Sequence, residues 1–314
     1  MDKLETWIET TPYASWQIEK ASEDASFRRY FRLRNGGESL IVMDASREKT
    51  ALAPFVDVTQ RLAECGVHAP RIAYEDLPAG FLVLEDLGSA PLLSRLDAAS
   101  FERDYERCME VIVRMQHART DGLPLYDRTF LLNETALMQT WFWQRYLGRE
   151  ADAETAALLQ EVQAHIVDVV LSQPQGVFVH RDFHSRNIMV TPSGALGIID
   201  YQDAMNGPVT YDLVSLLKDL YVRFDPDRIA ALALRFRDAA RIDADDATFL
   251  RWFDYTGMQR HLKVLGIFAR LWLRDGKAGY LDDLPLTLQY TIEAAARYEA
   301  TRPLARLLET VRLP

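Results

Sequence analysis

Three polar side chains in the middle of the sequence have the types and the spacing that a phosphoryl-transfer site requires. Asp182 lies in a polar stretch, Asn187 follows it by five residues, and Asp200 follows Asn187 by thirteen. In such a site one carboxylate accepts the proton of the attacking hydroxyl, while an amide oxygen and a second carboxylate hold the magnesium that bridges the phosphates of ATP. Asp182 is therefore the candidate base, and Asn187 and Asp200 are the candidate metal ligands.

The residues around these three groups predict the elements that would hold them. Short apolar runs at 176–179, 188–190 and 195–199 are typical of strands, and a Pro-Ser-Gly turn separates the last two. Asp182 and Asn187 would lie in the loop between the first two strands, and Asp200 would end the third. Asp and Asn are also common in ordinary turns, but an ordinary turn has no need of all three residues at this spacing.

The stretch from His180 to Asn187, His-Arg-Asp-Phe-His-Ser-Arg-Asn, resembles the kinase catalytic loop H-R-D-x-x-x-x-N. Its second histidine, His184, makes it similar to the aminoglycoside phosphotransferase and choline kinase superfamily, which consists of small-molecule kinases. Other segments resemble the bacterial anomeric kinases of N-acetylmuramate and N-acetylglucosamine, which act in peptidoglycan recycling. These segments are 25–32, 200–204, 207–213 and 259–266.

The resemblance implies an α+β, protein-kinase-like fold with two lobes. Residues 1–88 would form a small antiparallel-sheet lobe and hinge for the nucleotide, and residues 89–314 a larger, mainly helical lobe. Patterning agrees with this division. It predicts strands at 26–34, 39–43, 71–74 and 80–84 around a helix at 51–65, then a helix that begins after Ser100 and a long helix around 247–273.

The resemblance also implies a nucleotide site in the small lobe, with adenine held by the backbone of Glu85 and Leu87. Two expected features are missing from the sequence. The stretch 21–26 has no glycine where the family has a Gly-rich loop, and Met43 occupies the position of the usual phosphate-binding lysine. The glutamate that would pair with this lysine should fall near Phe55, so both members of the ion pair are absent.

Arginines at the start of the small lobe are the candidate replacement for the lysine. Strand alternation puts Arg29 on the same, inward face as Phe31 and Leu33, so Arg29 is our first candidate for a phosphate contact and Arg28 our second. The alternative is that these arginines are solvated or pair with surface acids such as Glu23 and Asp24.

The acceptor site is predicted from four residues in the larger lobe. Trp143 could stack on a sugar ring, Arg260 and Lys263 could bind the carboxylate of N-acetylmuramate, and Asp203 could meet a sugar hydroxyl. The alternative for the aromatic residue is a place in the core. Other polar residues near the loop have expected structural roles: Asp212 as a helix N-cap or as a brace for the loop, and His180 and His184 as hydrogen-bonding supports.

Composition limits the setting in which this chain works. The net charge of −10 disfavours nucleic acid and anionic membranes as partners, because phosphate binding needs clustered Lys and Arg. No apolar run approaches the length of a membrane span, and the two cysteines imply no disulfide scaffold. We expect a cytoplasmic protein with ATP, Mg²⁺ and a small amino sugar as its ligands, and no obligate protein partner.

Three functions compete at this point. The first is an ATP-dependent kinase of the anomeric hydroxyl of N-acetylmuramate and N-acetylglucosamine. The second is another small-molecule kinase of the superfamily, with choline, an aminoglycoside or a similar amine as acceptor. The third is an inactive kinase fold that only binds nucleotide, which the missing lysine favours and the presence of Asp182, Asn187 and Asp200 opposes.

Overall fold

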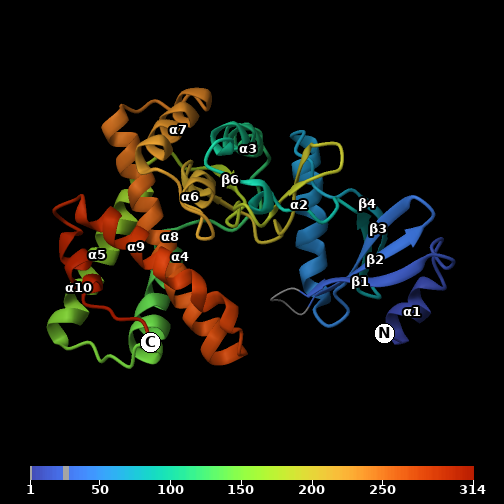
Figure 1. The fold of residues 1–314 in the computed structure, drawn as a ribbon, viewed down its shortest axis with the longest axis horizontal. Coiled ribbons are helices and arrows are strands. Elements are labelled where there is room, and N and C mark those ends of the chain that lie inside the picture. The colour runs from blue at the N-terminus through green and yellow to red at the C-terminus, as the bar shows by residue number, and fades with distance from the viewer. Residues whose placement is uncertain (1, 24–27) are drawn as a thin grey trace. The chain divides into compact units, whose positions relative to one another are not determined.

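A computed structural model describes residues 2–23 and 28–314 of the chain (Figure 1). By their internal contacts the residues form two compact units. Unit 1 comprises the chain up to Ser94 together with Arg186–Asp203, and unit 2 comprises Arg95–Ser185 together with Ala204–Pro314. The loop that carries the candidate base and metal ligands therefore begins in unit 2 and ends in unit 1.

Unit 1 is built on a five-stranded antiparallel sheet in the order β1-β2-β3-β5-β4. Two helices, α1 and α2, lie on opposite faces of this sheet (Figure 1). One face is apolar, and there Phe31, Leu33 and Val42 pack against Leu4 and Trp7 of α1. The bounds of these elements are α1 Asp2–Ile8, β1 Gln17–Glu23, β2 Arg29–Asn35, β3 Glu38–Asp44, α2 Leu52–Glu64, β4 Ile72–Asp76 and β5 Phe81–Glu85.

The predicted order of strands and helix in this lobe is confirmed, but α1 and β1 were not predicted. The strand Gln17–Glu23 is a polar edge strand, so it lacks the alternation of apolar residues by which a half-buried strand is recognised. The strand expected at 26–34 begins at Arg29. Phe27, Asp24 and the second half of the glycine-free stretch 21–26 lie outside the described residues.

A hairpin from the middle of the sequence belongs to unit 1. Its strands are β7 (Ile188–Val190) and β8 (Leu196–Ile198). The N–H of Val190 donates to the carbonyl of Ala90 at 2.8 Å, and the N–H of Ile198 donates to the carbonyl of His68 at 2.9 Å. These bonds explain why residues 186–203, which the sequence places in the larger lobe, group with the first unit.

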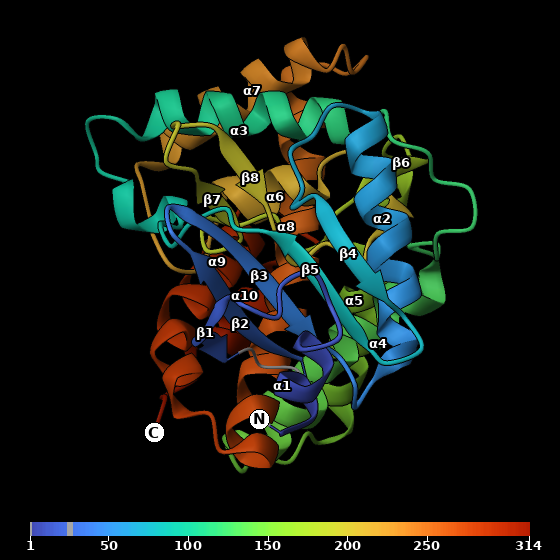
Figure 2. The same ribbon diagram turned by 90° about the vertical axis from the view of Figure 1, so that its right-hand side faces the viewer.

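Unit 2 is mainly helical, and its longest helix, α8, runs from Asp246 to Asp275. The middle of α8 is buried among the other helices. Helices α3 and α7 lie side by side (Figure 2), held in part by ion pairs of Arg228 with Glu102 and of Arg235 with Glu106. The remaining elements are α3 Phe101–Met115, α4 Arg128–Leu137, α5 Ala153–Ser172, β6 Val177–Val179, β9 Met205–Gly207, α6 Tyr211–Leu217, α7 Pro226–Ala239, α9 Leu284–Ala296 and α10 Arg302–Glu309.

The start of α3 is not capped by the serine that precedes it. The side chain of Ser100 makes no cap bond at the start of α3; instead the carboxylate of Asp97 accepts the N–H groups of Ala99 and Ser100, each at 2.8 Å.

Gly266 of α8 lies so close to α4 that an added Cβ would be 2.3 Å from the carbonyl carbon of Leu137. Gly266 therefore permits the close packing of α8 on the helix that carries Glu134.

No helix within residues 2–23 and 28–314 combines the length and the apolar character that crossing a bilayer requires.

Candidate active site

The candidate base, Asp182, lies in unit 2 in a loop whose backbone is firmly held. The preceding residue, Arg181, has a φ of 79°, which is unusual for a residue with a side chain. The carboxylate of Asp212 accepts the N–H of His180 at 2.7 Å and the N–H of Arg181 at 3.0 Å. Ser215 donates its hydroxyl to the carbonyl of Arg181 at 3.3 Å. Of the two roles expected for Asp212, the loop brace is confirmed, and it holds a strained backbone of the kind found at functional sites.

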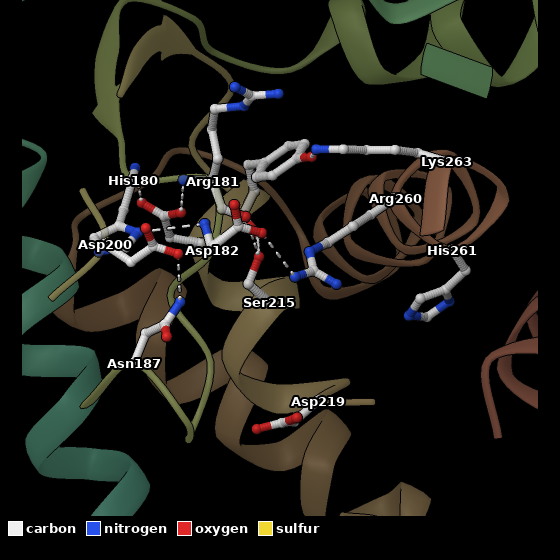
Figure 3. A network of polar contacts seen from close by, with 12 residues as sticks. His180, Arg181, Asp182, Asn187, Asp200, Ser215, Asp219, Arg260, His261 and Lys263 are labelled. Atoms are coloured by element: carbon white, nitrogen blue, oxygen red, sulfur yellow. Dashed lines mark hydrogen bonds and ion pairs between the residues drawn. The ribbon is translucent and has the colours of Figure 1, made fainter. Parts of the chain in front are cut away.

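Cations surround the carboxylate of Asp182. The side chain of Asp182 is 43% exposed, and Arg260, which is only 3% exposed, places a guanidinium nitrogen 3.6 Å from it (Figure 3). Burial would raise the pKa of Asp182, but the charges of Lys263 and Arg260, with a smaller contribution from Arg181, hold that pKa well below its ordinary value. Asp182 is therefore ionised at neutral pH and able to accept a proton.

Glu134 of α4 is the centre of a buried charge network beneath this loop, and sequence patterning did not identify it. Its carboxylate accepts Arg181 at 2.8 Å, Lys263 at 3.0 Å and the amide of Gln259 at 3.0 Å. Burial would raise the pKa of Glu134, but the charges of Lys263 and Arg181 lower it. One carboxylate thus pairs with two cations, and one of these, Arg181, directly precedes Asp182 in the chain.

Removing the charge of Glu134 is expected to destabilise the fold strongly. Glu134→Gln should lower the free energy of unfolding by about 3–5 kcal/mol, because Lys263 and Arg181 would keep their charges in a buried site. Chemical denaturation measures this change. In the double variant Glu134→Gln, Lys263→Met the loss should be smaller than in the single variant, since one of the unmatched charges is gone. A single variant within 0.5 kcal/mol of the wild type would contradict the role of Glu134 as a counter-charge.

The structure places the four expected acceptor residues in different environments. Lys263 is buried and committed to Glu134, with a further bond to the hydroxyl of Tyr211 at 3.3 Å, so it is not placed to bind a carboxylate of the acceptor. Trp143 is buried in the core of unit 2, which leaves no ring face for a sugar. Arg260 contacts Asp182, as described above. Asp203 is exposed in unit 1, where Gln202 donates to it at 3.2 Å.

The histidines near the loop contact other parts of the protein and support the fold. The Nδ1 atom of His180 accepts the N–H of Asp182 at 3.3 Å, so it supports the loop as expected. Burial lowers the pKa of His184 to about 4, which makes it neutral at physiological pH. His261 stacks on Tyr290 with ring centroids 5.3 Å apart. The motif 259–266 therefore serves mainly to build the interior of unit 2 around Asp182.

The candidate metal ligands, Asn187 and Asp200, lie together in unit 1. The amide nitrogen of Asn187 is 3.4 Å from the carboxylate of Asp200 (Figure 3). Gln202 donates to the same carboxylate at 3.0 Å. Asp200 has a φ of 65°, a second strained backbone position in a residue with expected chemistry.

These residues fit magnesium. One carboxylate and one amide oxygen are hard oxygen ligands, and Mg²⁺ commonly takes one or two carboxylates from a protein and its other ligands from phosphates and water. In the part of the chain that the structure describes, no group of three or more His, Cys, Asp or Glu side chains could hold a metal by itself.

A cavity of about 520 Å³ in unit 1 opens beside these ligands. Apolar side chains line it, among them Ile41 and Leu84 of the sheet, Met189 of β7 and Ile199, which directly follows β8. The expected hinge residues Glu85 and Leu87 also line it, as do Asn187 and Asp200. The N–H of Glu85 is already donated to the carbonyl of Arg71 at 2.8 Å. The volume and the mainly apolar lining suit a flat base such as adenine.

The side chains of β2 alternate between this cavity and the opposite face of the sheet. Tyr30 and Arg32 line the cavity, whereas Phe31 and Leu33 pack on the face that α1 covers. Arg29 lies on the same face of the sheet as Phe31, and its Nε atom donates to the carboxylate of Asp44 at 3.1 Å. Arg29 thus shares the face of Phe31 and Leu33 as expected, but its guanidinium pairs with Asp44 on the face of the sheet opposite to Tyr30 and Arg32, which line the cavity. This position argues against the expected contact of Arg29 with phosphate.

The missing lysine and its missing partner are explained by the packing at their positions. Met43 pairs with Tyr30 across the strands and is fully buried. Phe55 of α2 packs on Tyr201 with ring centroids 5.0 Å apart, and the hydroxyl of Tyr201 shares a hydrogen bond of 2.8 Å with Thr59. Apolar and aromatic contacts have replaced the ion pair, which avoids a lone buried charge.

Comparison with known proteins adds sequence and fold relatives. Residues 17–253 match the phosphotransferase enzyme family. The chain is 40% identical to the N-acetylmuramate/N-acetylglucosamine kinase of Pseudomonas aeruginosa, over 98% of this chain and 91% of that protein. It is 39% identical to the protein of the same name from Neisseria meningitidis serogroup B, over 98% of this chain and 94% of that protein.

Among solved structures, the fold is similar to choline kinase LicA from Streptococcus pneumoniae, with a TM-score of 0.65 at 13% identity over 93% of this chain and 98% of that one. It is also similar to the ADP-bound aminoglycoside phosphotransferase APH(2'')-Ib, with a TM-score of 0.64 at 14% identity and the same two coverages. At these identities the likeness concerns the fold alone, and it confirms the expected kinase-like α+β class.

Proposed function

The chain belongs to the phosphotransferase enzyme family, and we propose that it transfers the γ-phosphoryl group of ATP to the anomeric hydroxyl of N-acetylmuramate and N-acetylglucosamine. The observation that carries this proposal is the 40% identity, over nearly the full length of both chains, to a protein named N-acetylmuramate/N-acetylglucosamine kinase. The products would be sugar 1-phosphates, and the resemblance of the motifs implies a place in peptidoglycan recycling.

In the proposed reaction, Asp182 accepts the proton of the C1 hydroxyl as that oxygen attacks phosphorus. An anomeric hydroxyl is more acidic than an ordinary alcohol, so an ionised carboxylate suffices as the base. Arg260, 3.6 Å away, orients Asp182 and helps keep it ionised. The brace from Asp212 fixes the backbone from which Asp182 projects.

The nucleotide has a proposed site in the cavity of unit 1. The backbone at Glu85 and Leu87 would hold adenine, and the apolar side chains of Ile41, Leu84 and Ile199 would pack on its faces. Asn187 and Asp200 would hold magnesium beside the phosphates. When bound, magnesium neutralises phosphate charge and favours transfer of the γ-phosphoryl group.

A guanidinium beside the proposed base favours an acceptor that carries a carboxylate. Arg260 places a nitrogen 3.6 Å from Asp182, where it would also be able to donate to the carboxylate of N-acetylmuramate. Lys263 and Arg181 do not add to this preference, because both are paired with Glu134. Of the four expected acceptor residues, Arg260 and Asp203 remain candidates for contact with the sugar, while Lys263 and Trp143 support the site from within the protein.

An acceptor screen tests the proposal. Purified protein is incubated with ATP and magnesium and, one at a time, with N-acetylglucosamine, N-acetylmuramate, choline and an aminoglycoside, and ADP release is measured. We expect turnover with the two sugars and none above the acceptor-free rate with the two amines. Turnover with the amines alone would replace this function by the amine-kinase alternative. Tight ATP binding without turnover on any acceptor would favour the inactive nucleotide-binding fold.

A further inference from the structure

The cavity in unit 1 needs a positive charge for the phosphates of the nucleotide, and the usual lysine position holds Met43. Phosphate groups in a partly desolvated site are stabilised by cationic donors placed at their oxygens. Magnesium alone neutralises only part of the charge of a nucleoside triphosphate. A second cation from this chain is therefore expected close to Asp200, the proposed metal ligand.

Two of the three arginines at the start of β2 are committed elsewhere. Arg29 pairs with Asp44 on the face of the sheet that α1 covers. Arg32 does line the cavity, but its Nε atom is 2.6 Å from the carboxylate of Asp86, and a second nitrogen is 3.2 Å from the same carboxylate. This two-bond pair fixes β2 to the hinge and raises the pKa of Arg32, mainly through the hydrogen bond to Asp86.

The third, Arg28, points to the metal ligand. It is 8% exposed, and its guanidinium nitrogen lies 3.6 Å from the carboxylate oxygen of Asp200. It precedes β2 by one residue, two positions before Tyr30, which lines the cavity and pairs with Met43. By the alternation of an extended chain, Arg28 lies on the same side as Tyr30. It is therefore close to Met43, which occupies the position of the usual lysine.

We propose that Arg28 binds the phosphates of the nucleotide in place of the missing strand lysine, an inference that rests on the nucleotide site of the proposed function. A guanidinium is planar and presents five N–H donors, so one edge can face Asp200 while another donates to phosphate oxygens. A lysine on β3 would reach the phosphates from the neighbouring strand. In this chain the positive charge is instead supplied by the residue just before β2, and the position of the lysine on β3 is filled by the buried Met43.

The proposal predicts a loss of affinity that is specific for phosphates. Arg28→Gln should weaken ADP binding by about tenfold to a hundredfold, the equivalent of one lost charged hydrogen bond. Adenosine binding should not change, because the proposed contact is to the phosphates and Arg28 is not among the residues that line the cavity proposed for the base. Arg28→Lys should lose less than Arg28→Gln, since the charge is kept. The matched control is Arg29→Gln, the same substitution one residue along, which should bind ADP like the wild type.

Calorimetry with ADP and with adenosine, each in EDTA and in magnesium, measures these affinities, and circular dichroism checks that each variant is folded. The loss with ADP should persist in EDTA, because the proposed contact is direct. A loss seen only with magnesium would mean that Arg28 acts through Asp200, and equal losses for ADP and adenosine would mean a purely structural role; either result overturns the proposal, as does unchanged ADP binding. A wild-type protein that binds neither compound would instead overturn the nucleotide site itself.

Discussion

Asp182→Asn is expected to lower kcat by about 10²-fold or more, the scale of losing a general base, while ADP still binds with wild-type affinity. The amide has nearly the same size as the carboxylate but cannot accept the proton of the sugar hydroxyl. Nucleotide affinity should be kept because the cavity proposed for ADP lies in unit 1, whereas Asp182 belongs to unit 2.

Steady-state turnover with N-acetylglucosamine and calorimetry with ADP measure the two halves of this prediction. Asp243→Asn is a suitable control, because Asp243 is exposed and the substitution makes the same change of charge. If the folded Asp182→Asn variant turned over within about threefold of the control, Asp182 would not be the base.

Asp200→Ala is expected to abolish metal-dependent turnover. Asp200 provides the only carboxylate of the proposed metal site, and Asn187 alone is a neutral ligand, so magnesium would be held by phosphates and water without a charged anchor in the protein. The strained backbone at Asp200, with its φ of 65°, indicates that the surrounding structure is built to hold this side chain in place.

Turnover over a titration of magnesium measures the effect, and calorimetry with Mn²⁺ in the presence of ADP reports metal binding without catalysis. Glu38→Ala is the control, because Glu38 is an exposed carboxylate of the same unit. Either full activity of the wild type in excess EDTA, or turnover by Asp200→Ala at saturating magnesium, would contradict the assignment.

The groups with expected chemistry could be found in the sequence because their types and spacing are fixed by the reaction. Asp182, Asn187 and Asp200 keep their intervals whatever surrounds them, and the short strands β6, β7 and β8 beside them were predicted from apolar runs. The loop brace by Asp212 was also among the expected roles. The three strands depend on local sequence alone, whereas the brace joins residues 32 positions apart.

The sequence predicted which side chains share a face of β2, but not what each face of the strand packs against. Alternation correctly placed Arg29 with Phe31 and Leu33, but the apolar layer on that face is supplied by α1, a short helix that the sequence did not reveal. Without α1, alternation does not show which face of the strand is turned to the nucleotide. Trp143 shows the same limit, since an aromatic residue of a helical lobe can serve the core or a ligand and only packing decides which.

Glu134 could not be predicted because its partners are distant in sequence. It is separated by 47 residues from Arg181 and by 125 from Gln259, and nothing around it marks a motif. The same network explains why Lys263 is not placed to bind the acceptor. The packing of the helices decides which carboxylate pairs with which buried cation. Local patterns in a single sequence do not predict that packing.

The most direct test of the whole account is phosphorus NMR of the product formed from ATP and N-acetylglucosamine. An attack by the C1 hydroxyl, with Asp182 accepting its proton, gives a sugar 1-phosphate. We therefore expect a single sugar-phosphate signal whose phosphorus couples to the C1 proton. Coupling to the C6 protons, or no sugar phosphate at all while ATP is bound, would contradict the proposed anomeric kinase.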